Sequence, residues 1–173
     1  DGVWEASGPI EIAPDGAFDL LAPAERDLAA VLAASVIPLT LDQLSRILPP
    51  STLDEALERL IRSGWARPGF RIASPSRRRA VPEAARSKWH QPIAFGIESM
   101  GGKPSVERLH AMSHHWLAAG NAPRGLPFGL RMAELLLRRN AAAQAAAIYE
   151  QCATLAPAAE RRGLLERARE AWH

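Results

Sequence analysis

Residues 129–157 read GLRMAELLLRRNAAAQAAAIYEQCATLAP, and this stretch fits a 34-residue helical repeat that closes at Pro157. In such a repeat, small or medium apolar side chains fall where two helices touch, and a proline ends the second helix. The residues at those positions are Ala133, Leu136, Ala145, Tyr149 and Cys152. Stacked repeats bury one face against their neighbours and present a concave surface to a partner. The stretch therefore predicts an interaction module.

The helix before this stretch follows the same pattern. A second, overlapping register ends at Gly120-Asn121 and places four residues on the inner side of a helix: Leu109, Met112, Ser113 and Trp116. Both registers match the tetratricopeptide pattern. We expect about one and a half such repeats, built from helices over 105–119, 123–139, 141–155 and 158–172.

The last of these helices has an apolar stripe that needs a cover. The stripe consists of Leu164, Leu165, Ala168 and Trp172. A face of this kind packs against a further repeat or against a second copy. We therefore expect the chain to be a piece of a longer protein, or to form a homodimer through its C-terminal helix.

Upstream, three short helices are expected to precede a hairpin. Apolar stripes predict helices over 23–35, 40–48 and 51–63, and residues 65–72 predict two short strands around a Pro68-Gly69 turn. Another short hairpin is expected within residues 3–16. Three helices followed by a hairpin are the order of a winged-helix domain.

Local signals mark the ends of these helices. Thr40 and Gln43 have the spacing of a capping box, Ser51 or Thr52 is expected to cap the third helix, and Gly64 to end it. The side chains expected to face the core are Leu41, Leu44, Ile47 and Leu48 from the second helix and Leu53, Leu57, Leu60 and Ile61 from the third.

The predicted fold class is mostly α, in three parts. A winged-helix domain with short β-hairpins covers residues 1–74, a bridging helix and linker cover 75–104, and tetratricopeptide-like helical repeats cover 105–173. The segment Ser74-Pro75-Ser76 marks the first boundary. The bridging helix is expected from about Pro82 to Ser99, with Pro92 kinking or splitting it.

Composition and charge exclude several classes of protein. With 47% hydrophobic and 23% charged residues the chain has an ordinary globular balance, and its net charge of +2 gives little support to a general nucleic-acid or membrane-surface role. No stretch approaches the roughly 18 apolar residues of a membrane span. The single cysteine, Cys152, excludes an internal disulfide and is expected to be a buried structural thiol. We expect a cytoplasmic protein.

Residues 107–121 read ERLHAMSHHWLAAGN, and this helix resembles one found in bacterial STAND-type regulatory ATPases, downstream of the ATPase domain. In that family a similar segment with paired histidines and a tryptophan opens the helical repeats. Residues 129–136 and 145–152 resemble the helices that follow, and the resemblance covers about residues 20–160. It implies a fragment of a larger bacterial signalling ATPase.

The resemblance also implies a role without catalysis. The winged helix would pack on the neighbouring ATPase domain and relay its state, and the repeats would hold a protein partner in their groove. The phosphate-binding loop Gly-x-x-x-x-Gly-Lys-Ser/Thr does not occur in the chain, so we expect no ATP hydrolysis. No catalytic residue and no cofactor is predicted. An enzyme accessory domain that clamps a peptide substrate in the repeat groove is a further alternative.

Three histidines, His110, His114 and His115, invite a metal interpretation. His110 and His114 are one helical turn apart and can share a zinc ion. The helix lacks the glutamate that follows the first histidine in metalloproteases, and no Cys or Asp is near in sequence. We therefore predict no metal site, with one histidine packed near Trp116.

The runner-up function is a winged-helix DNA-binding transcriptional regulator with a helical dimerisation region. Its recognition helix, which would enter the major groove, would be the third predicted helix. In that helix Asp54, Glu55 and Glu58 outnumber Arg59 and Arg62. Affinity for DNA needs several basic side chains on the docking face. The excess of acidic side chains on this helix therefore disfavours nucleic-acid binding. The residues that could contact a partner or nucleic acid are Arg59, Arg62, Arg67, Arg71, Arg77, Arg78 and Arg79.

Overall fold

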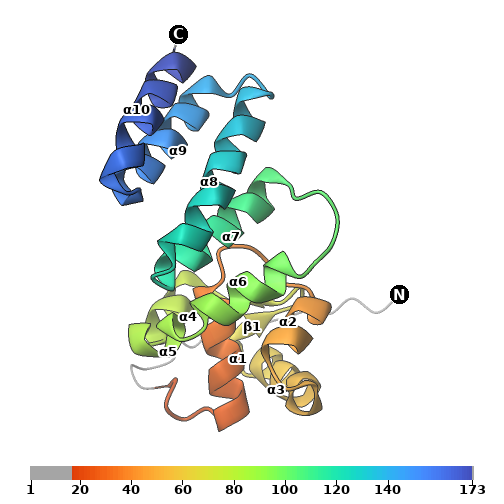
Figure 1. Ribbon diagram of the computed structural model, residues 1–173. Helices are drawn as coiled ribbons and strands as arrows, with labels where there is room; N and C mark the ends of the chain where they lie inside the picture. The colour runs from red at the N-terminus through yellow and green to blue at the C-terminus, as the bar shows by residue number, and fades with distance from the viewer. Residues whose placement is uncertain (1–16, 173) are drawn as a thin grey trace.

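The computed structural model describes residues 17–172, so the hairpin expected within residues 3–16 lies outside the described residues. Over these residues the fold is mostly helical, with one two-stranded antiparallel sheet. A lower body is followed by a helical array that rises away from it (Figure 1). The elements of the body are α1 (Pro23–Ala34), α2 (Leu41–Ile47), α3 (Pro50–Arg62), β1 (Ala66–Arg67), β2 (Arg71–Ile72), α4 (Pro75–Ala80), α5 (Glu83–Ser87) and α6 (His90–Glu98). The array consists of α7 (Val106–Ala118), α8 (Ala122–Leu137), α9 (Ala142–Leu155) and α10 (Ala158–Trp172).

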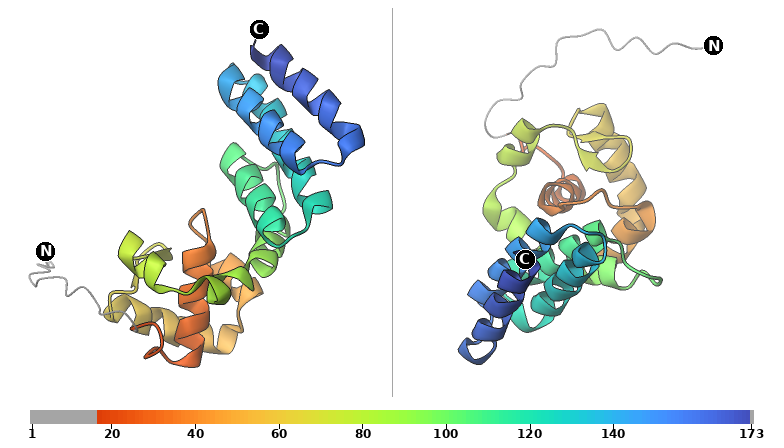
Figure 2. Two further views of the ribbon diagram at one scale, coloured as in Figure 1. Left: turned by 90° about the vertical axis from the view of Figure 1, so that its left-hand side faces the viewer. Right: turned by 90° about the horizontal axis from the view of Figure 1, so that it is seen from above.

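Helix α1 is the centre of the lower body. Every residue from Leu28 to Ala34 is buried, and α1 packs against α3, α5 and β2. Seen end-on, it lies inside a ring of the other elements (Figure 2, right). The second half of α1, residues 28–34, is apolar all round and needs such a position, because no face of it can be left to water.

The capping box at Thr40, the glycine end of the third helix and the hairpin are confirmed. Thr40 Oγ1 accepts from Gln43 N at 3.2 Å, and Thr40 N donates to Gln43 Oε1 at 2.6 Å. Gly64 has φ +70° and ends α3, since a left-handed residue there lets the next N–H reach back into the helix. The strands pair antiparallel, with Ala66 opposite Ile72.

Three details of α2 and α3 differ from the prediction. Leu41 is 44% exposed and Ile61 is 37% exposed, although both were expected to face the core. Helix α3 begins at Pro50, so neither Ser51 nor Thr52 caps it. Proline suits the first helical position because the N–H it lacks has no partner there in any case.

The predicted bridging helix is not continuous. Residues 82–99 form two helices, α5 and α6, separated at Lys88 and Trp89, and Pro92 lies in the first turn of α6. The split predicted at Pro92 is confirmed: in a continuous helix the Pro92 ring would clash with the carbonyl of Lys88, four residues earlier. In the observed arrangement Pro92 lies in a first turn, where it removes no helical hydrogen bond. Helix α4 was not expected; its N-cap, Ser74, accepts from Arg77 N at 3.2 Å.

In the array each helix packs against the next one along the chain, α7 on α8, α8 on α9 and α9 on α10. The residues expected inside the array are buried: Leu109, Met112, Ser113, Trp116, Ala133, Leu136, Ala145, Tyr149 and Cys152. Gly129 lets three helices approach closely, because a Cβ there would lie 2.9 Å from Cys152 Sγ and 3.1 Å from Ser113 Oγ. The small residues thus set the helix spacing.

The apolar stripe of α10 is only partly covered. Leu164 and Ala168 are buried, whereas Leu165 is 48% exposed and Trp172 is 59% exposed. Figure 2 (left) shows α10 at the outer end of the array. Among residues 17–172, no helix combines the length and the apolar character needed to cross a membrane.

Helix α6 joins the body to the array. It packs against α2 on one side and against α7 on the other. The Arg108 guanidinium of α7 donates to the carbonyl of Ile97 at 2.9 and 3.2 Å, to that of Gly101 at 3.0 Å, and to that of Met100. One side chain therefore caps the C-terminal end of α6 and fastens the loop after it.

A second group of side chains holds the same junction. The Trp116 indole is completely buried, and its Nε1 donates to Glu98 Oε2 at 3.2 Å. The Phe95 ring meets it edge-on with centroids 4.7 Å apart. The Arg124 guanidinium lies 4.3 Å from the centroid of the Trp116 ring and pairs with Glu98 at 3.1 Å. The tryptophan of the paired-histidine segment thus docks α7 and α8 onto α6.

Candidate functional site

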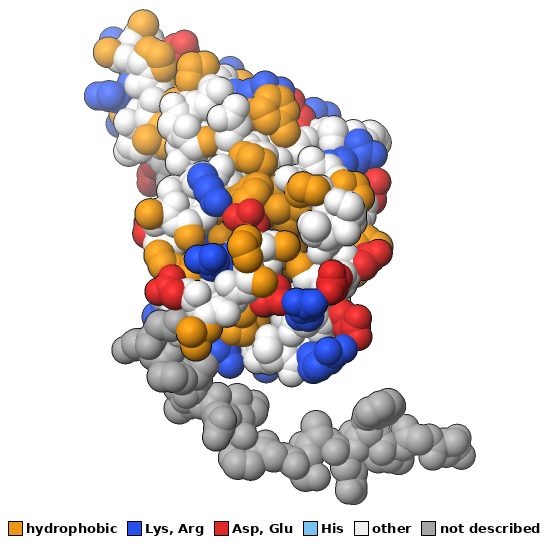
Figure 3. Space-filling view, turned by 90° about the horizontal axis from the view of Figure 1, so that it is seen from below, with side chains coloured by type: hydrophobic (Ala, Val, Ile, Leu, Met, Phe, Trp, Pro, Cys, Tyr) orange, Lys and Arg blue, Asp and Glu red, His pale blue; other side chains and the backbone are white. Residues whose placement is uncertain are grey.

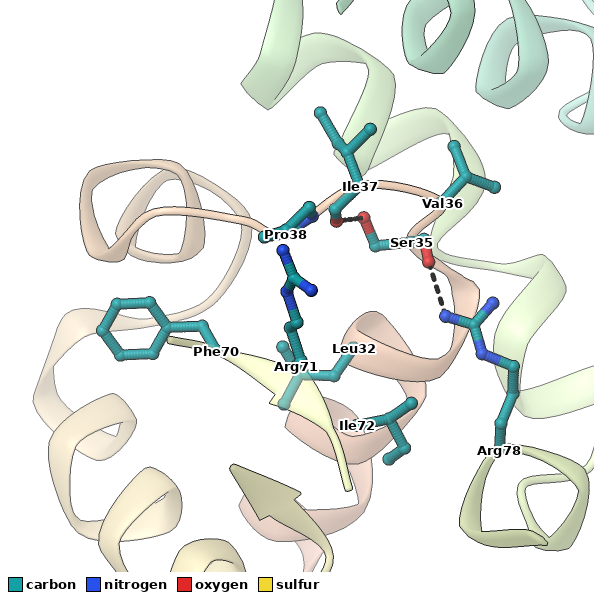
Figure 4. A pocket seen from close by; sticks show the side chains of 9 residues that line it. All are labelled: Leu32, Ser35, Val36, Ile37, Pro38, Phe70, Arg71, Ile72 and Arg78. Carbon is teal, nitrogen blue, oxygen red and sulfur yellow. Dashed lines mark hydrogen bonds between the residues drawn. The ribbon is translucent and has the colours of Figure 1, made fainter. Parts of the chain in front are cut away.

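A pocket of about 400 Å³ opens between the end of α1, the hairpin and α4. We call it the hairpin pocket, and Figure 4 shows its lining residues, which are Leu32, Ser35, Val36, Ile37, Pro38, Phe70, Arg71, Ile72 and Arg78. Its volume lies within the range of small-ligand and side-chain pockets. Six of the nine lining residues are apolar, and two are arginines.

The wall on the α1 side is held by two hydrogen bonds. Ser35 Oγ donates to the Ile37 carbonyl at 2.6 Å, and Arg78 Nη2 donates to the Ser35 carbonyl at 2.8 Å (Figure 4). These bonds keep the short link between α1 and α2 extended, which leaves Val36 37% exposed at the pocket. Half-buried Arg78 therefore both builds the wall and places a positive charge there.

The opposite wall comes from the hairpin. Phe70 has φ +55°, a left-handed conformation that costs a non-glycine residue of order 1 kcal/mol or more. Arg71 is exposed, and no ion pair involves it among residues 17–172. Strain of this kind persists only where the surroundings enforce it, and it is common at binding sites.

Two of the seven predicted contact arginines are already paired on α3. Arg59 bonds Glu55 at 2.5 Å and approaches Glu25 at 3.6 Å, and Arg62 bonds Glu58 at 2.6 Å. Figure 3 shows acidic and basic side chains interspersed on the end of the molecule that lies lowest in Figure 1. The face of α3 therefore has no cluster formed by unpaired Arg59 and Arg62 that could bind phosphates.

The other five lie near the hairpin or on α4. Arg71 and Arg78 meet in the hairpin pocket, Arg77 stacks over Trp65 at 4.6 Å from the ring centroid, and Arg67 and Arg79 are exposed outside the pocket. The arginines thus do not form one patch, and two of them share a site.

Sequence reasoning missed the apolar half of the pocket. Val36, Ile37 and Phe70 were read as parts of a link and a strand, not as a binding surface. The signal that could have found them is an apolar link, Val36-Ile37-Pro38, too short to form a core of its own.

The structure groups the histidines differently from the sequence analysis. His114 and His115 of α7 meet His90, the first residue of α6, and one ligand nitrogen from each ring lies within 4.8 Å of the others. His90 Nδ1 and His115 Nδ1 are 2.9 Å apart. His115 is completely buried, His90 is 8% exposed, and His114 is exposed. His110 is not part of this histidine cluster, although its ring centroid is 6.2 Å from that of His114.

Burial keeps the histidine cluster neutral. It lowers the pKa of His115 to about 3, with the neighbouring imidazoles acting in the same direction. Burial also lowers the pKa of His90, which Glu83 raises and Arg86 lowers, and the pKa of His114. In contrast, burial raises the pKa of the Cys152 thiol and disfavours its nucleophilic form.

We predict that the protein loses stability as the pH falls below about 6.5. The unfolded chain takes up protons on imidazoles of ordinary pKa, 6.5, while His115 in the folded chain stays neutral down to about 3. The unfolded state therefore binds more protons in this window, and the free energy of unfolding falls by up to about 1.4 kcal/mol per pH unit for His115 alone.

Urea unfolding in EDTA-containing buffer from about pH 8 to pH 5 measures this effect while the carboxylates stay ionised. His115→Gln should flatten the profile, and His110→Ala, on the exposed side of the same helix, should leave it unchanged. A wild-type profile that is flat below pH 6.5 would contradict the assignment.

Comparisons of the chain with protein-family models, with curated proteins and with solved structures find no match. The resemblance to STAND-type regulatory ATPases thus stays a prediction.

Proposed function

We propose that this chain is a non-catalytic protein-interaction and signal-relay module of a larger cytoplasmic bacterial signalling ATPase. Its lower body would be the winged-helix part of that protein, and the array its tetratricopeptide-like repeats. The occupant of the hairpin pocket is an extended segment of a protein partner that carries an acidic side chain next to apolar ones. The observation that carries the proposal is the pairing of Arg71 and Arg78 with an apolar wall in one pocket.

Charge on the hairpin supports an acidic occupant. Arg67 and Arg71 are direct partners in the strand register, both are exposed, and like charges opposite each other destabilise a sheet. A carboxylate bound at Arg71 would relieve that repulsion. Arginine also binds carboxylates through two parallel hydrogen bonds, which fixes the orientation of the bound segment.

The apolar wall supports a peptide over a nucleic acid. Val36, Ile37 and Phe70 offer packing for a neighbouring apolar side chain, which a phosphate backbone lacks. The alternative, a DNA-binding regulator with a helical dimerisation region, would rely on α3, whose Arg59 and Arg62 are paired with glutamates of the same helix. Charge pairing therefore favours the protein partner.

Continuous packing supports a relay. The link that forms one wall of the pocket joins α1 to α2, α2 packs against α6, and α6 packs against α7. An occupant that shifts this link would bear on α6 through a single intervening helix. The array would then present a changed groove to a protein partner bound there, distinct from the occupant of the hairpin pocket.

Fluorescence polarisation with a labelled peptide library tests the pocket. Extended peptides with one glutamate beside leucine or phenylalanine should bind, and the same peptides with glutamine in place of glutamate should bind at least about tenfold more weakly. Arg71→Glu should abolish binding. Arg79→Glu makes the same charge change on an exposed residue outside the pocket and should leave binding intact.

Equal loss in Arg71→Glu and Arg79→Glu would show a general charge effect and overturn the pocket. A duplex-DNA arm tests the alternative. Sequence-selective binding that survives physiological salt and is lost in the double variant Arg59→Gln, Arg62→Gln would replace the proposal with the DNA-binding regulator.

A further inference from the structure

The histidine cluster of His90, His114 and His115 brings three imidazoles together at the junction of α6 and α7. The ring centroid of His115 lies 5.1 Å from that of His90 and 5.1 Å from that of His114. Two of the rings are buried and the third is exposed. The cluster thus has a fixed inner part and one side chain that solvent can reach.

The nitrogen spacing is close to that of a metal centre. Ligand nitrogens about 2.0–2.1 Å from a tetrahedral zinc ion lie roughly 3.3–3.4 Å from each other. His90 Nδ1 and His115 Nδ1 are 2.9 Å apart, and the spread within the cluster reaches 4.8 Å. A small opening of the buried pair and a rotation of exposed His114 would bring all three to coordination distance.

The ring nitrogens of the histidine cluster have few hydrogen-bond partners within the protein. The Nδ1 atoms of His90 and His115 face each other, so one ring must donate to the other. His115 Nε2 is buried without a hydrogen-bond partner. In the described part of the chain no carboxylate bonds any of the three rings. Buried polar atoms normally have partners. An ion bound by the two Nδ1 atoms would replace the hydrogen bond between them, while Nε2 of His115 would stay unpaired.

We propose that His90, His114 and His115 bind one divalent transition-metal ion, with zinc as the best match, and that the ion fastens α6 to α7. Three neutral imidazoles are a donor set for zinc, cobalt, nickel or copper, whereas magnesium and calcium require oxygen ligands. The fourth position faces the solvent side of His114 and takes water. The ion enters from that side.

The neutral state of the rings supports this proposal. Metal ions bind deprotonated imidazole, so a site whose histidines stay neutral at physiological pH loses no affinity to protons. The pKa values of all three rings are lowered by burial. The metal site is separate from the hairpin pocket. A negative result in the metal-binding test would therefore leave the proposed function intact.

Metal titration of the tag-free full chain, stripped with EDTA, tests the proposal. Zinc should bind with a stoichiometry of one per chain in a competition assay with a chromophoric chelator, and it should raise the melting temperature. Cobalt should give the intense visible absorption of a tetrahedral nitrogen site. Magnesium should change neither readout.

Two variants on exposed positions of α7 separate the cluster from surface histidines. His114→Ala should weaken zinc binding at least about tenfold, and because its side chain is exposed the variant should fold like the parent. His110→Ala, one turn earlier on the same helix, should bind zinc like the parent. If His114→Ala retains full affinity, or if His110→Ala loses as much, the cluster is a hydrogen-bonded pair and not a metal site.

Discussion

Replacing Trp116 by alanine is expected to lower the free energy of unfolding by about 3–5 kcal/mol, the usual cost of removing a large buried aromatic ring. The Trp116 indole is completely buried and is enclosed by the Phe95 ring and the Arg124 guanidinium, 4.7 and 4.3 Å away between centres. The substitution would also leave Glu98 without the indole N–H that now donates to it at 3.2 Å. The loss falls on the junction between body and array.

Urea unfolding followed by circular dichroism measures this loss, and the chain supplies a matched control. Trp172, on α10, is 59% exposed, so Trp172→Ala removes the same side chain from a site with far less burial. It should cost well under half as much. Equal losses from the two substitutions would mean that Trp116 does not anchor the junction.

Replacing Tyr149 by alanine should cost a similar amount, roughly 3–5 kcal/mol. Tyr149 is 3% exposed and lies in the core of the array with Ala145 and Cys152 on the same helix. Its removal leaves a cavity that rigid helix packing cannot fill, because Ala133 and Ala145 already hold the helices close. The melting temperature of the variant reports the effect.

Gln144→Ala is the control for Tyr149→Ala, since Gln144 is exposed on the same helix. It should melt within a degree or two of the parent, because surface substitutions usually change stability by less than about 0.5 kcal/mol. If Gln144→Ala melts lower than Tyr149→Ala, the repeat frame assigned to α8 and α9 is wrong.

The parts of the fold that could be predicted from the sequence depend on neighbours along the chain. A capping box needs only Thr40 and Gln43, and a glycine end needs only Gly64, so both followed from spacing. The inner residues of the array followed from helical periodicity, because each helix packs against the next one in sequence. Such contacts leave a regular trace in the sequence.

The parts that could not be predicted depend on contacts between distant segments. Leu41 and Ile61 fit their helical stripes but lie beyond the edge of the surface that α1 and α6 cover. The break before α6 has a local signal in Pro92, but the packing of α6 against α2 and α7 has none. Periodicity identifies the apolar face of a helix. It does not show how much of that face the neighbouring helices bury.

The candidate sites show the same division. Arg71 and Arg78 were recognised as exposed bases, but the apolar wall that unites them comes from the end of α1. His114 and His115 stood out together, whereas His90 lies 25 residues from His115 in sequence and was not considered. Residue types could be read from the chain; their grouping required the tertiary fold.

The fastening of α6 by Arg108 has a mechanical consequence. The loop Met100-Gly101-Gly102 has the composition of a free joint, yet its first two carbonyls and that of Ile97 accept from one guanidinium on α7. Because these hydrogen bonds hold α6 to α7, the two helices turn together as one rigid unit. The α6 end of this unit lies in the lower body. A small rotation of α6 against α2 then becomes a larger displacement at α10, the element farthest from the pivot (Figure 2).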